Sequence, residues 1–438
     1  MFLTYSLAFL HEIHIFSLFL QRFRKRTKMT KEERDFIRLH REENANDLLL
    51  HSRGNPMIDM KVVACQVQGW QKARQKLPLW AEREDIIFPE RLPMEQCSSQ
   101  VTAEYKGKMA KRLIQQSDDA SIKTRKVLLT DLTGGFGVDA TMMARNVEGA
   151  MLTFVEKNTK LCRLADHNLP LLGVKNHKIK NDTCEQVLQT LPKQDIIYID
   201  PARRDLNGNK TVRIEECTPN LADIHPTLLD KADIVMAKLS PMLDITDAIR
   251  KLSHLTEIHI ASVDGECKEI LLVLQSSLSS TQKTKTKIVC ANINNNSTQL
   301  FTFYIGDEQS AVCRIASKVG KYLYEPNASV MKAGAFKTVG ERFGLGKLHN
   351  SSHLYTSEGI VAEFPGRTFT VDQTFTMSKK DIKTLRQKTS QSNITTRNFP
   401  ISVAEVRRKL KMKEGGDFFI FATTLADNSH TLILCHKA

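Results

Sequence analysis

Zinc-ligand spacings and CxxC pairs are missing from this sequence, although it contains nine cysteines among its 438 residues. The cysteines lie at positions 65, 97, 162, 184, 217, 267, 290, 313 and 435, and none forms a Cys/His pattern typical of a zinc module. This distribution argues against a bound metal. It favours a reduced, cytosolic chain in which most thiols are inert.

The N-terminal residues also lack the charge order of a secretory signal. Residues 1–20 are apolar and aromatic, but the basic cluster QRFRKRTK follows them, whereas a secretory signal carries its positive charge first. His11, Glu12 and His14 interrupt the apolar stretch, and each would be costly inside a bilayer. We expect residues 1–28 to form a disordered or loosely helical extension, with a membrane anchor as the less favoured alternative.

Positive charge is in clear excess. The chain has 63 Lys and Arg against 49 Asp and Glu, a net charge of +14. Such an excess favours polyanionic partners, nucleic acid or an anionic surface, although it can also serve only solubility. The length exceeds one ordinary core and predicts two or three domains.

Six short apolar runs separated by helix-sized intervals lie between residues 126 and 274. They are KVLLTDL (126–132), AMLTFVE (150–156), KIKND (178–182), DIIYIDP (195–201), ADIVMAKL (232–239) and EIHIASV (257–263). Strands that alternate with helices predict right-handed crossovers and a mainly parallel sheet. Ligands of such sheets bind beyond the carboxyl ends of the strands.

The turn TGGFGVD (133–139) follows the first of these runs and contains three glycines. Glycine leaves no side chain between the backbone and a ligand, and it adopts positive φ where a turn requires it. Asp131 and Asp139 bring negative charge to the turn, which would repel a pyrophosphate. A cationic or phosphate-free nucleoside cofactor therefore fits better than NAD.

Two further acidic residues follow the second and third runs. Glu156 ends the second run, where an acidic residue can accept hydrogen bonds from both hydroxyls of a ribose. Asp182 follows the third run, where it could bind an exocyclic amine of adenine. Each signal is weak alone, but their order and spacing together predict a nucleoside site.

This arrangement resembles the class I S-adenosylmethionine-dependent methyltransferases over roughly residues 95–275. The first motif matches DLTGGFGVD, the second-strand acid matches Glu156 and the fourth motif matches DPAR. The strings EQCSSQ, LTGGFGVD, DPARR and KLSPMLD are similar to those of bacterial, Bacteroidetes-type members with a THUMP-like C-terminal domain, from about Ala64 to the C-terminus.

The resemblance implies S-adenosylmethionine as cofactor and assigns site residues one by one. The implied cofactor-binding residues are Asp131, Thr133, Gly134, Gly135, Gly137, Asp139, Glu156 and Asp182. The implied catalytic residues, from the fourth motif, are Asp200, Pro201 and Arg203. A sulfonium methyl is already activated, so the protein mainly aligns it with a nucleophile and stabilises the moving charge.

The fourth motif departs from that of amino-methylating relatives, which have Pro and an aromatic residue where this chain has Ala202 and Arg203. Asp200 could still accept a hydrogen bond from an amine, and Arg203 could stack, hold phosphate or form an ordinary surface ion pair. Carbon-5 methylation needs a cysteine nucleophile, and the loop KLSPMLD has none.

Other residues near the fourth motif leave alternatives open. Cys217 and Cys267 lie nearby in sequence, although core packing is the more common role of such cysteines. Asp244 is either a second polar group of the site or a helix N-cap. The pattern favours nitrogen over carbon as the atom methylated.

The C-terminal quarter combines α/β order with dense positive charge. Ser378 with Asp381, and Ser402 with Glu405, predict two capped helices, and FFIFATT and TLILCHK predict a closing hairpin. The stretch 377–413 holds eleven Lys or Arg against two acidic residues. The order resembles THUMP-type RNA-binding domains, and the charge suits phosphate contacts, with a solvated charged face as the alternative.

These observations predict an α/β chain with a Rossmann-like class I methyltransferase sheet, an N-terminal helical region and a C-terminal α+β THUMP-like domain. The expected boundaries are a helical region at 29–112, the methyltransferase domain at 113–275, a linker and β-hairpin unit at 276–320, and the RNA-binding domain at 321–438. The predicted function is methylation of a base nitrogen in structured RNA, ribosomal or transfer. The alternatives are a DNA or small-molecule methyltransferase, and an inactive RNA-binding protein on this fold.

Overall fold

The computed structural model describes residues 29–51, 58–117, 125–202, 213–277, 283–294 and 297–438, which form two compact units divided after Tyr198. The expected N-terminal extension, residues 1–28, lies outside the described residues, and so does Arg203. No helix within the described ranges is both long enough and apolar enough to cross a membrane.

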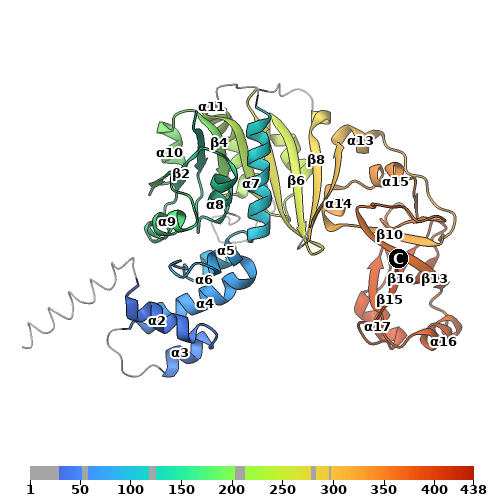
Figure 1. Ribbon diagram of the computed structural model, residues 1–438. Coiled ribbons are helices and arrows are strands. Elements are labelled where there is room, and N and C mark those ends of the chain that lie inside the picture. Colours follow the sequence, from blue (N-terminus) through green and yellow to red (C-terminus); the bar gives the residue numbers. More distant parts are fainter. Residues whose placement is uncertain (1–28, 52–57, 118–124, 203–212, 278–282, 295–296) are drawn as a thin grey trace, which may run out of the picture. The chain divides into compact units, whose positions relative to one another are not determined.

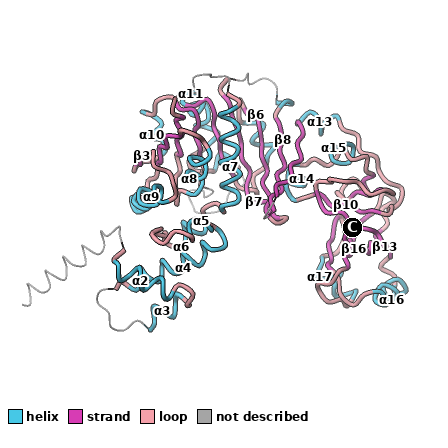
Figure 2. The backbone as a smooth tube through the Cα atoms, in the orientation of Figure 1, coloured by secondary structure: helices cyan, strands magenta, loops and turns pink. Residues whose placement is uncertain are grey.

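The first unit begins with helices, which precede its strands in the sequence (Figures 1 and 2). They are α2 (Lys31–His40), α3 (Ala45–His51), α4 (Met60–Lys76), α5 (Pro78–Ala81), α6 (Arg91–Gln96) and α7 (Gln100–Gln115). Thr30 begins α2 with a capping box and Asp59 caps α4, because their side chains accept backbone N–H groups that a helix start leaves unpaired. The buried Trp80 belongs to the core of this region.

The helical spacing of EQCSSQVTAEYKGKMAKRLI (95–114) predicts one longer helix, and this prediction is wrong. The structure breaks the helix after Gln96, and α7 begins at Gln100 because Ser99 caps it by accepting from the Thr102 amide. The break places Ser98 outside both helices, and its side chain is buried.

The sheet of the first unit has the strand order β3-β2-β1-β4. The strands are β1 (Val127–Asp131), β2 (Ala150–Val155), β3 (His177–Lys180) and β4 (Gln194–Ile199), and all three pairings are parallel. The helices between them are α8 (Val138–Asn146), α9 (Thr159–Leu171) and α10 (Cys184–Thr190). The carboxyl ends of β1 and β2 therefore lie at one edge, as the spacing predicts.

The second unit contains strands in the order β5-β7-β6-β8-β9. They are β5 (Ala232–Leu239), β6 (Leu255–Val263), β7 (Glu266–Gln275), β8 (Lys287–Asn294) and β9 (Ser297–Tyr304), with α11 (Leu221–Lys231), α12 (Ile245–Lys251) and α13 (Ile305–Ser310). β7 is antiparallel to both β5 and β6, and no predicted strand corresponds to it. The predicted hairpin β8–β9 is confirmed.

A second sheet follows in the same unit, with the order β11-β12-β10-β13-β16-β15-β14. Its elements are β10 (Tyr322–Pro326), α14 (Ala328–Ala333), α15 (Thr338–Arg342), β11 (Gly346–Lys347), β12 (Tyr355–Ser357), β13 (Gly366–Phe375), α16 (Lys379–Lys388), β14 (Asn393–Arg397), α17 (Val403–Leu410), β15 (Phe418–Thr424) and β16 (His430–Lys437). The caps of α16 and α17 and the hairpin β15–β16 are confirmed. The glycines at 334, 340, 344 and 346 predict a loop-rich connector over residues 324–350. This stretch instead contains the end of β10 together with α14, α15 and β11.

Candidate cofactor and acceptor site

The glycine turn connects the end of β1 to α8. The amide of Leu132 donates to the Tyr198 carbonyl at 3.0 Å, and the amide of Gly134 donates to the Val155 carbonyl at 2.8 Å. These bonds tie the turn to the two strands that flank β1. The backbone of the turn is therefore fixed at the carboxyl edge of the sheet.

A different physical constraint requires glycine at each of the three positions of the turn. A Cβ on Gly134 would lie 2.2 Å from the ring of Phe154, so this glycine lets the turn pack on β2. Gly135 and Gly137 have φ values of 55° and 85°, which side chains disfavour, and Gly137 is the N-cap of α8. A Cβ on Gly135 would meet only the Thr133 carbonyl, at 3.8 Å, so space beside that residue is open.

Glu156 faces the glycine turn from the end of β2. Its Oε2 accepts the Gly135 amide at 2.9 Å and its Oε1 accepts the Asn158 amide at 2.7 Å. A carboxylate oxygen can accept two hydrogen bonds, so each oxygen keeps one acceptor position. The half-buried side chain can thus bind the two hydroxyls of a ribose, and the residues present fit S-adenosylmethionine.

Asp131 ends β1 beneath the turn. Only 1% of the residue is exposed, and Oδ1 accepts the Thr133 amide at 2.9 Å. A buried negative charge at this edge is compatible with a cationic sulfonium and not with a pyrophosphate. Thr133 is half-buried and lies on the same turn.

Asp182 follows β3 and is exposed, and its Oδ1 accepts the Thr183 amide at 2.9 Å. Thr183 caps α10, and the buried Cys184 begins that helix. Burial raises the pKa of the Cys184 thiol to about 12, and the charges of Glu185 and Asp131 contribute. The thiol is therefore neutral at physiological pH and packs beside the site as an apolar group.

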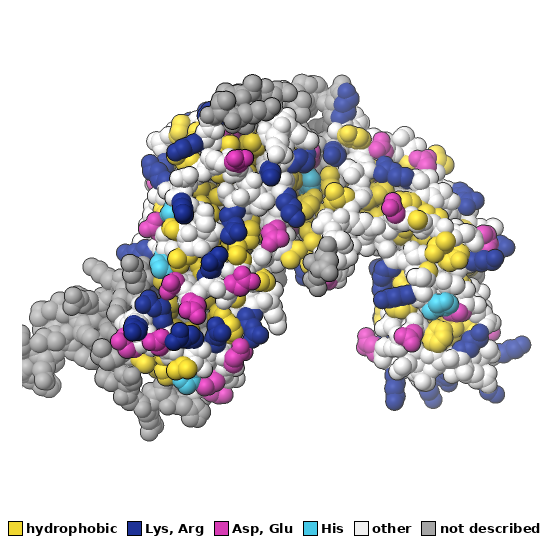
Figure 3. All heavy atoms as spheres, viewed as in Figure 1, with side chains coloured by type: hydrophobic (Ala, Val, Ile, Leu, Met, Phe, Trp, Pro, Cys, Tyr) yellow, Lys and Arg dark blue, Asp and Glu magenta, His cyan; other side chains and the backbone are white. Residues whose placement is uncertain are grey.

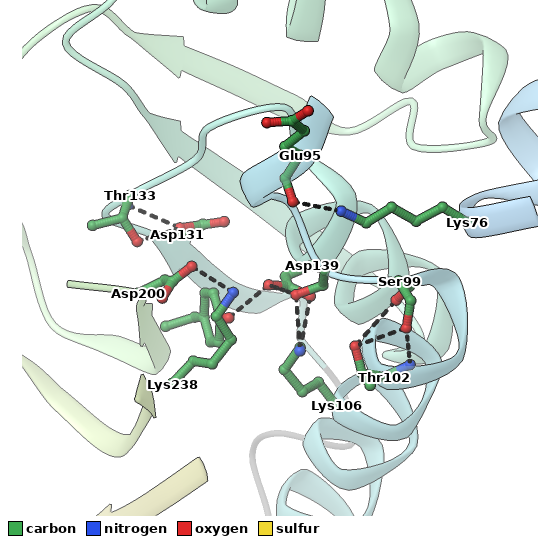
Figure 4. Close-up of polar contacts among 12 residues, drawn as sticks. Lys76, Glu95, Ser99, Thr102, Lys106, Asp131, Thr133, Asp139, Asp200 and Lys238 are labelled. Atoms are coloured by element: carbon green, nitrogen blue, oxygen red, sulfur yellow. Dashed lines mark hydrogen bonds and ion pairs between the residues drawn. The ribbon is translucent and has the colours of Figure 1, made fainter. Parts of the chain in front are cut away.

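Asp139 lies in a buried polar network (Figure 4). Its Oδ2 accepts hydrogen bonds from Ser98 Oγ at 2.8 Å and from Tyr198 OH at 2.7 Å. Lys106 Nζ lies 3.1 Å from Oδ1 and also donates to Ser98 Oγ at 3.1 Å. The network joins α7, α8 and β4. The sequence reasoning assigned no role to Ser98, Lys106 or Tyr198, although Ser98 and Tyr198 lie within quoted strings.

Asp200 and Pro201 directly follow β4. Lys238 Nζ, from β5, lies 2.5 Å from Asp200 Oδ2 (Figure 4). Pro201 is buried, and Ala202 forms a two-way backbone bridge with Thr218 at 2.8 and 2.9 Å. The segment that carries the fourth motif is thus fixed up to Ala202. The sequence reasoning missed Lys238, although the string KLSPMLD that begins with it was one of the quoted motifs.

The two cysteines left open by the sequence are poorly placed for nucleophilic catalysis. Burial raises the pKa of Cys267 to about 11, so its thiolate is scarce at neutral pH. Cys217 is buried, with its Sγ 3.7 Å from the Arg213 carbonyl. Asp244 caps α12 by accepting the Thr246 amide at 2.9 Å, which is the N-cap alternative.

Helices α16 and α17 carry the basic charge of the C-terminal module, defined as residues 322–437. Their apolar residues Leu385, Val406 and Leu410 pack into the same core as the strands of the second sheet. The cations point outward (Figure 3). Nine exposed Lys or Arg lie on or beside these helices: Lys379, Lys380, Lys383, Arg386, Lys388, Arg408, Lys409, Lys411 and Lys413.

Comparisons with known proteins agree with this architecture. Family models match residues 322–365 as a ferredoxin-like domain and residues 366–437 as THUMP domain-like. Uncharacterized S-adenosylmethionine-dependent methyltransferases from two strains of Mycobacterium tuberculosis are 25% identical over 274 residues, 61% of this chain and 69% of theirs.

A crystal structure from Porphyromonas gingivalis W83, classed as a methyltransferase, is 33% identical, covers 93% of this chain and 98% of its own, and has a TM-score of 0.82. These matches confirm the resemblance, the fold class and the cofactor expected from the sequence. The chain belongs to the S-adenosylmethionine-dependent methyltransferases that carry a THUMP-like C-terminal domain.

Proposed function

We propose that this methyltransferase acts on structured RNA, ribosomal or transfer, and methylates a base nitrogen. The proposal depends chiefly on one observation, the exposed cations of α16 and α17 within the THUMP-like match. Phosphate contacts supply affinity without reading sequence, so a module of this kind can hold a folded RNA while the chemistry takes place elsewhere.

The two acidic residues of these helices, Asp381 and Glu405, offset only part of that charge. Hydrogen bonds from Thr376 lower the pKa of Asp381, and hydrogen bonds from Ser402 lower the pKa of Glu405. Both carboxylates thus accept hydrogen bonds from residues at the starts of their helices. The cations around them remain available to a polyanion, which favours a nucleic-acid partner over the alternative of a purely solvated face.

Nitrogen is favoured as the acceptor atom because carbon-5 methylation needs a thiolate nucleophile, whereas the loop KLSPMLD has no cysteine and burial raises the pKa of the Cys267 thiol. S-adenosylmethionine supplies a methyl group that is already activated. The residues of the chain then align the acceptor, and Asp200 is the candidate to accept a hydrogen bond from its N–H group. We also propose that Pro201 and Arg203 contribute to this acceptor site.

Labelled-cofactor transfer tests the substrate class. Tritiated S-adenosylmethionine is incubated with the full chain and with total RNA, total DNA or a small-molecule extract from a strain that lacks the protein. Transfer to RNA alone is the expected result. Transfer to DNA or small molecules supports the second candidate, and saturable cofactor binding without any transfer supports an inactive RNA-binding protein.

Charge reversal on α16 tests the RNA-binding surface. We expect Lys379→Glu with Lys383→Glu to weaken RNA binding about tenfold or more and to reduce its salt dependence, because two phosphate contacts are lost. The measurement is RNA affinity as a function of salt concentration. The matched control is Lys268→Glu, outside this module, and equal losses in both variants would contradict the assignment.

Replacement of Asp200 tests the acceptor site. Asp200→Asn removes the charge but keeps the shape, and we expect a loss of turnover of about 100-fold or more with unchanged cofactor affinity. The control is Asp230→Asn, an exposed aspartate at the end of α11. Unchanged turnover of Asp200→Asn would remove this residue from the mechanism.

A further inference from the structure

Two exposed arginines of the C-terminal module share one buried carboxylate. Glu325, on β10, is 4% exposed. Its Oε2 accepts hydrogen bonds from Nε of Arg367, at 2.9 Å, and from Nη2 of the same residue, while its Oε1 accepts from Nη2 of Arg397 at 3.0 Å. The arginine side chains are 50% and 40% exposed. One carboxylate therefore fixes two guanidinium groups at the surface of the second sheet.

The two arginines bring more charge and more donors than Glu325 needs. One arginine would neutralise this carboxylate, so the second positive charge is in excess. Among the described residues, neither Nη1 of Arg367 nor Nε and Nη1 of Arg397 has a hydrogen-bond acceptor. A guanidinium presents its N–H donors in a planar fork that matches the oxygens of a phosphate. The pair can thus donate to an anion from solvent while Glu325 holds it in place.

An aromatic side chain lies beside the arginines, on the face of the sheet away from α16 and α17. Ile420 packs in the core that includes these helices, whereas its strand neighbour Phe419 packs on the other side, against the core of Phe369. Arg367 lies over both rings, 5.4 Å from the centroid of Phe369 and 5.9 Å from that of Phe419. Lys437, exposed at the end of β16, lies 6.0 Å from the Phe419 centroid. Cations therefore surround a half-buried aromatic ring.

A neighbouring histidine reports the electrostatic potential beside Arg397. Burial, with the charges of Lys347 and Arg397, lowers the pKa of His353 to about 4. Nearby positive charge disfavours protonation of an imidazole, so the potential on this side of Arg397 is positive although Glu325 pairs with it. The surface is therefore suited to an anion.

We propose that Arg367 and Arg397 bind the phosphate backbone of a single-stranded segment of RNA, with Phe419 beside them as the stacking surface for a base. Single strands are bound by cations combined with aromatic side chains, because their bases are not paired with a second strand. Glu325 is a positioning residue that holds both guanidinium groups. This inference rests on the proposed action on RNA, but it concerns a surface other than the lysines of α16 and α17.

The test measures how tightly the full chain binds a short single-stranded RNA, and the same RNA in a duplex, over a series of salt concentrations. The first variants are Arg397→Gln and Phe419→Leu. The third is the triple variant Glu325→Gln with Arg367→Gln and Arg397→Gln, which removes both guanidinium groups without leaving a charged carboxylate in the interior. Thermal unfolding is measured for every variant, and inorganic phosphate is titrated into the wild type.

The matched control is Arg342→Gln. Arg342 is also an exposed arginine over a phenylalanine, 4.8 Å from the centroid of Phe301, but its Nη1 donates to the Thr302 carbonyl of β9 at 2.6 Å. This variant therefore removes a stacked cation that does not belong to the Glu325 cluster. It should bind both RNAs as the wild type does.

We expect Arg397→Gln to weaken single-strand binding about tenfold and to reduce the slope of log K against log salt by about 0.7, because one phosphate contact is lost. The triple variant should reduce the slope by about twice as much. Phe419→Leu should weaken single-strand binding about fivefold or more with an unchanged slope, since it removes stacking and no charge. Duplex binding should change by less than about twofold in all of these variants.

Three results would overturn the inference: a folded triple variant with wild-type affinity and salt slope, equal losses for single strand and duplex, or inorganic phosphate that binds this cluster as tightly as the RNA does. If the triple variant does not fold, Arg397→Gln decides, because it leaves Glu325 paired with Arg367. Failure of the proposed function is distinguishable, since the wild type would then bind neither RNA. If Lys379→Glu with Lys383→Glu weakens RNA binding and the triple variant does not, only this inference fails.

Discussion

Replacement of Lys106 by Met should destabilise the first unit strongly. The side chain of Lys106 is fully buried and that of Asp139 is 10% exposed, so their ion pair is shielded from water. Lys106→Met leaves the carboxylate of Asp139 in the interior without its cation. Loss of one partner from a buried pair costs about 3–5 kcal/mol, whereas an exposed pair costs less than about 1 kcal/mol.

The remaining hydrogen bonds of Asp139 limit the loss but do not remove it. Ser98 and Tyr198 still donate to Oδ2 at 2.8 and 2.7 Å in the variant, which satisfies one oxygen only. Neutralising the acid as well should recover stability, so Lys106→Met with Asp139→Asn should be more stable than Lys106→Met alone. Tyr198→Phe removes one bond to a charged group and should cost about 1.5–3 kcal/mol.

Urea unfolding followed by tryptophan fluorescence is a suitable assay. The chain has two tryptophans, Trp70 and Trp80, and both belong to the first unit. Lys108→Met, at an exposed position of the same helix, is the control and should change the unfolding free energy by less than about 0.5 kcal/mol. A loss below about 1 kcal/mol for Lys106→Met, or no recovery in the double variant, would refute the reasoning.

Two other predictions concern the cofactor and pH. Glu156→Gln should raise the Kd for the cofactor by roughly 10-fold to 100-fold in calorimetry, because an amide nitrogen cannot accept a hydrogen bond from a ribose hydroxyl. The control Glu148→Gln should bind the cofactor as the wild type does. Burial, with the charges of Lys347 and Arg397, lowers the pKa of His353 from 6.5 to about 4. As the pH falls below 6.5, the His353 imidazole therefore takes up a proton in the unfolded chain before it does so in the folded chain. The unfolding free energy of the second unit should consequently decrease from pH 6.5 to pH 4. His353→Leu should flatten this slope in pH-dependent urea unfolding, and an unchanged slope would contradict the assignment.

The strands of the methyltransferase sheet could be predicted because each is short, apolar and followed by punctuation. All six predicted runs are strands, from β1 to β6, with bounds that differ by a few residues. Strand β7 was missed because Glu266–Gln275 follows β6 after only a two-residue turn, Asp264 and Gly265. Both turn residues have positive φ, and the pair DG is a hairpin signal that could have revealed it.

Side-chain direction was harder to predict than strand position. Asp139 ends the glycine turn and Glu156 ends the second apolar run, and the resemblance assigns both to the cofactor. The structure directs Glu156 to the turn and Asp139 to Lys106. Sequence pattern shows that a carboxylate follows a strand, but it does not show which distant residue meets it, because Lys106 precedes the turn and lies on another helix.

The buried network around Asp139 also connects two motifs that are far apart in the sequence. EQCSSQ spans the break between α6 and α7, and LTGGFGVD contains the glycine turn. Ser98 joins them by donating to Asp139 across 41 positions of sequence. Tyr198, near the end of strand β4 and two residues before Asp200, donates to the same carboxylate. Since Ser98 and Tyr198 both donate to Asp139 at the end of the glycine turn, a change at Ser98 should disturb this turn and alter cofactor binding, although Ser98 lies outside the turn.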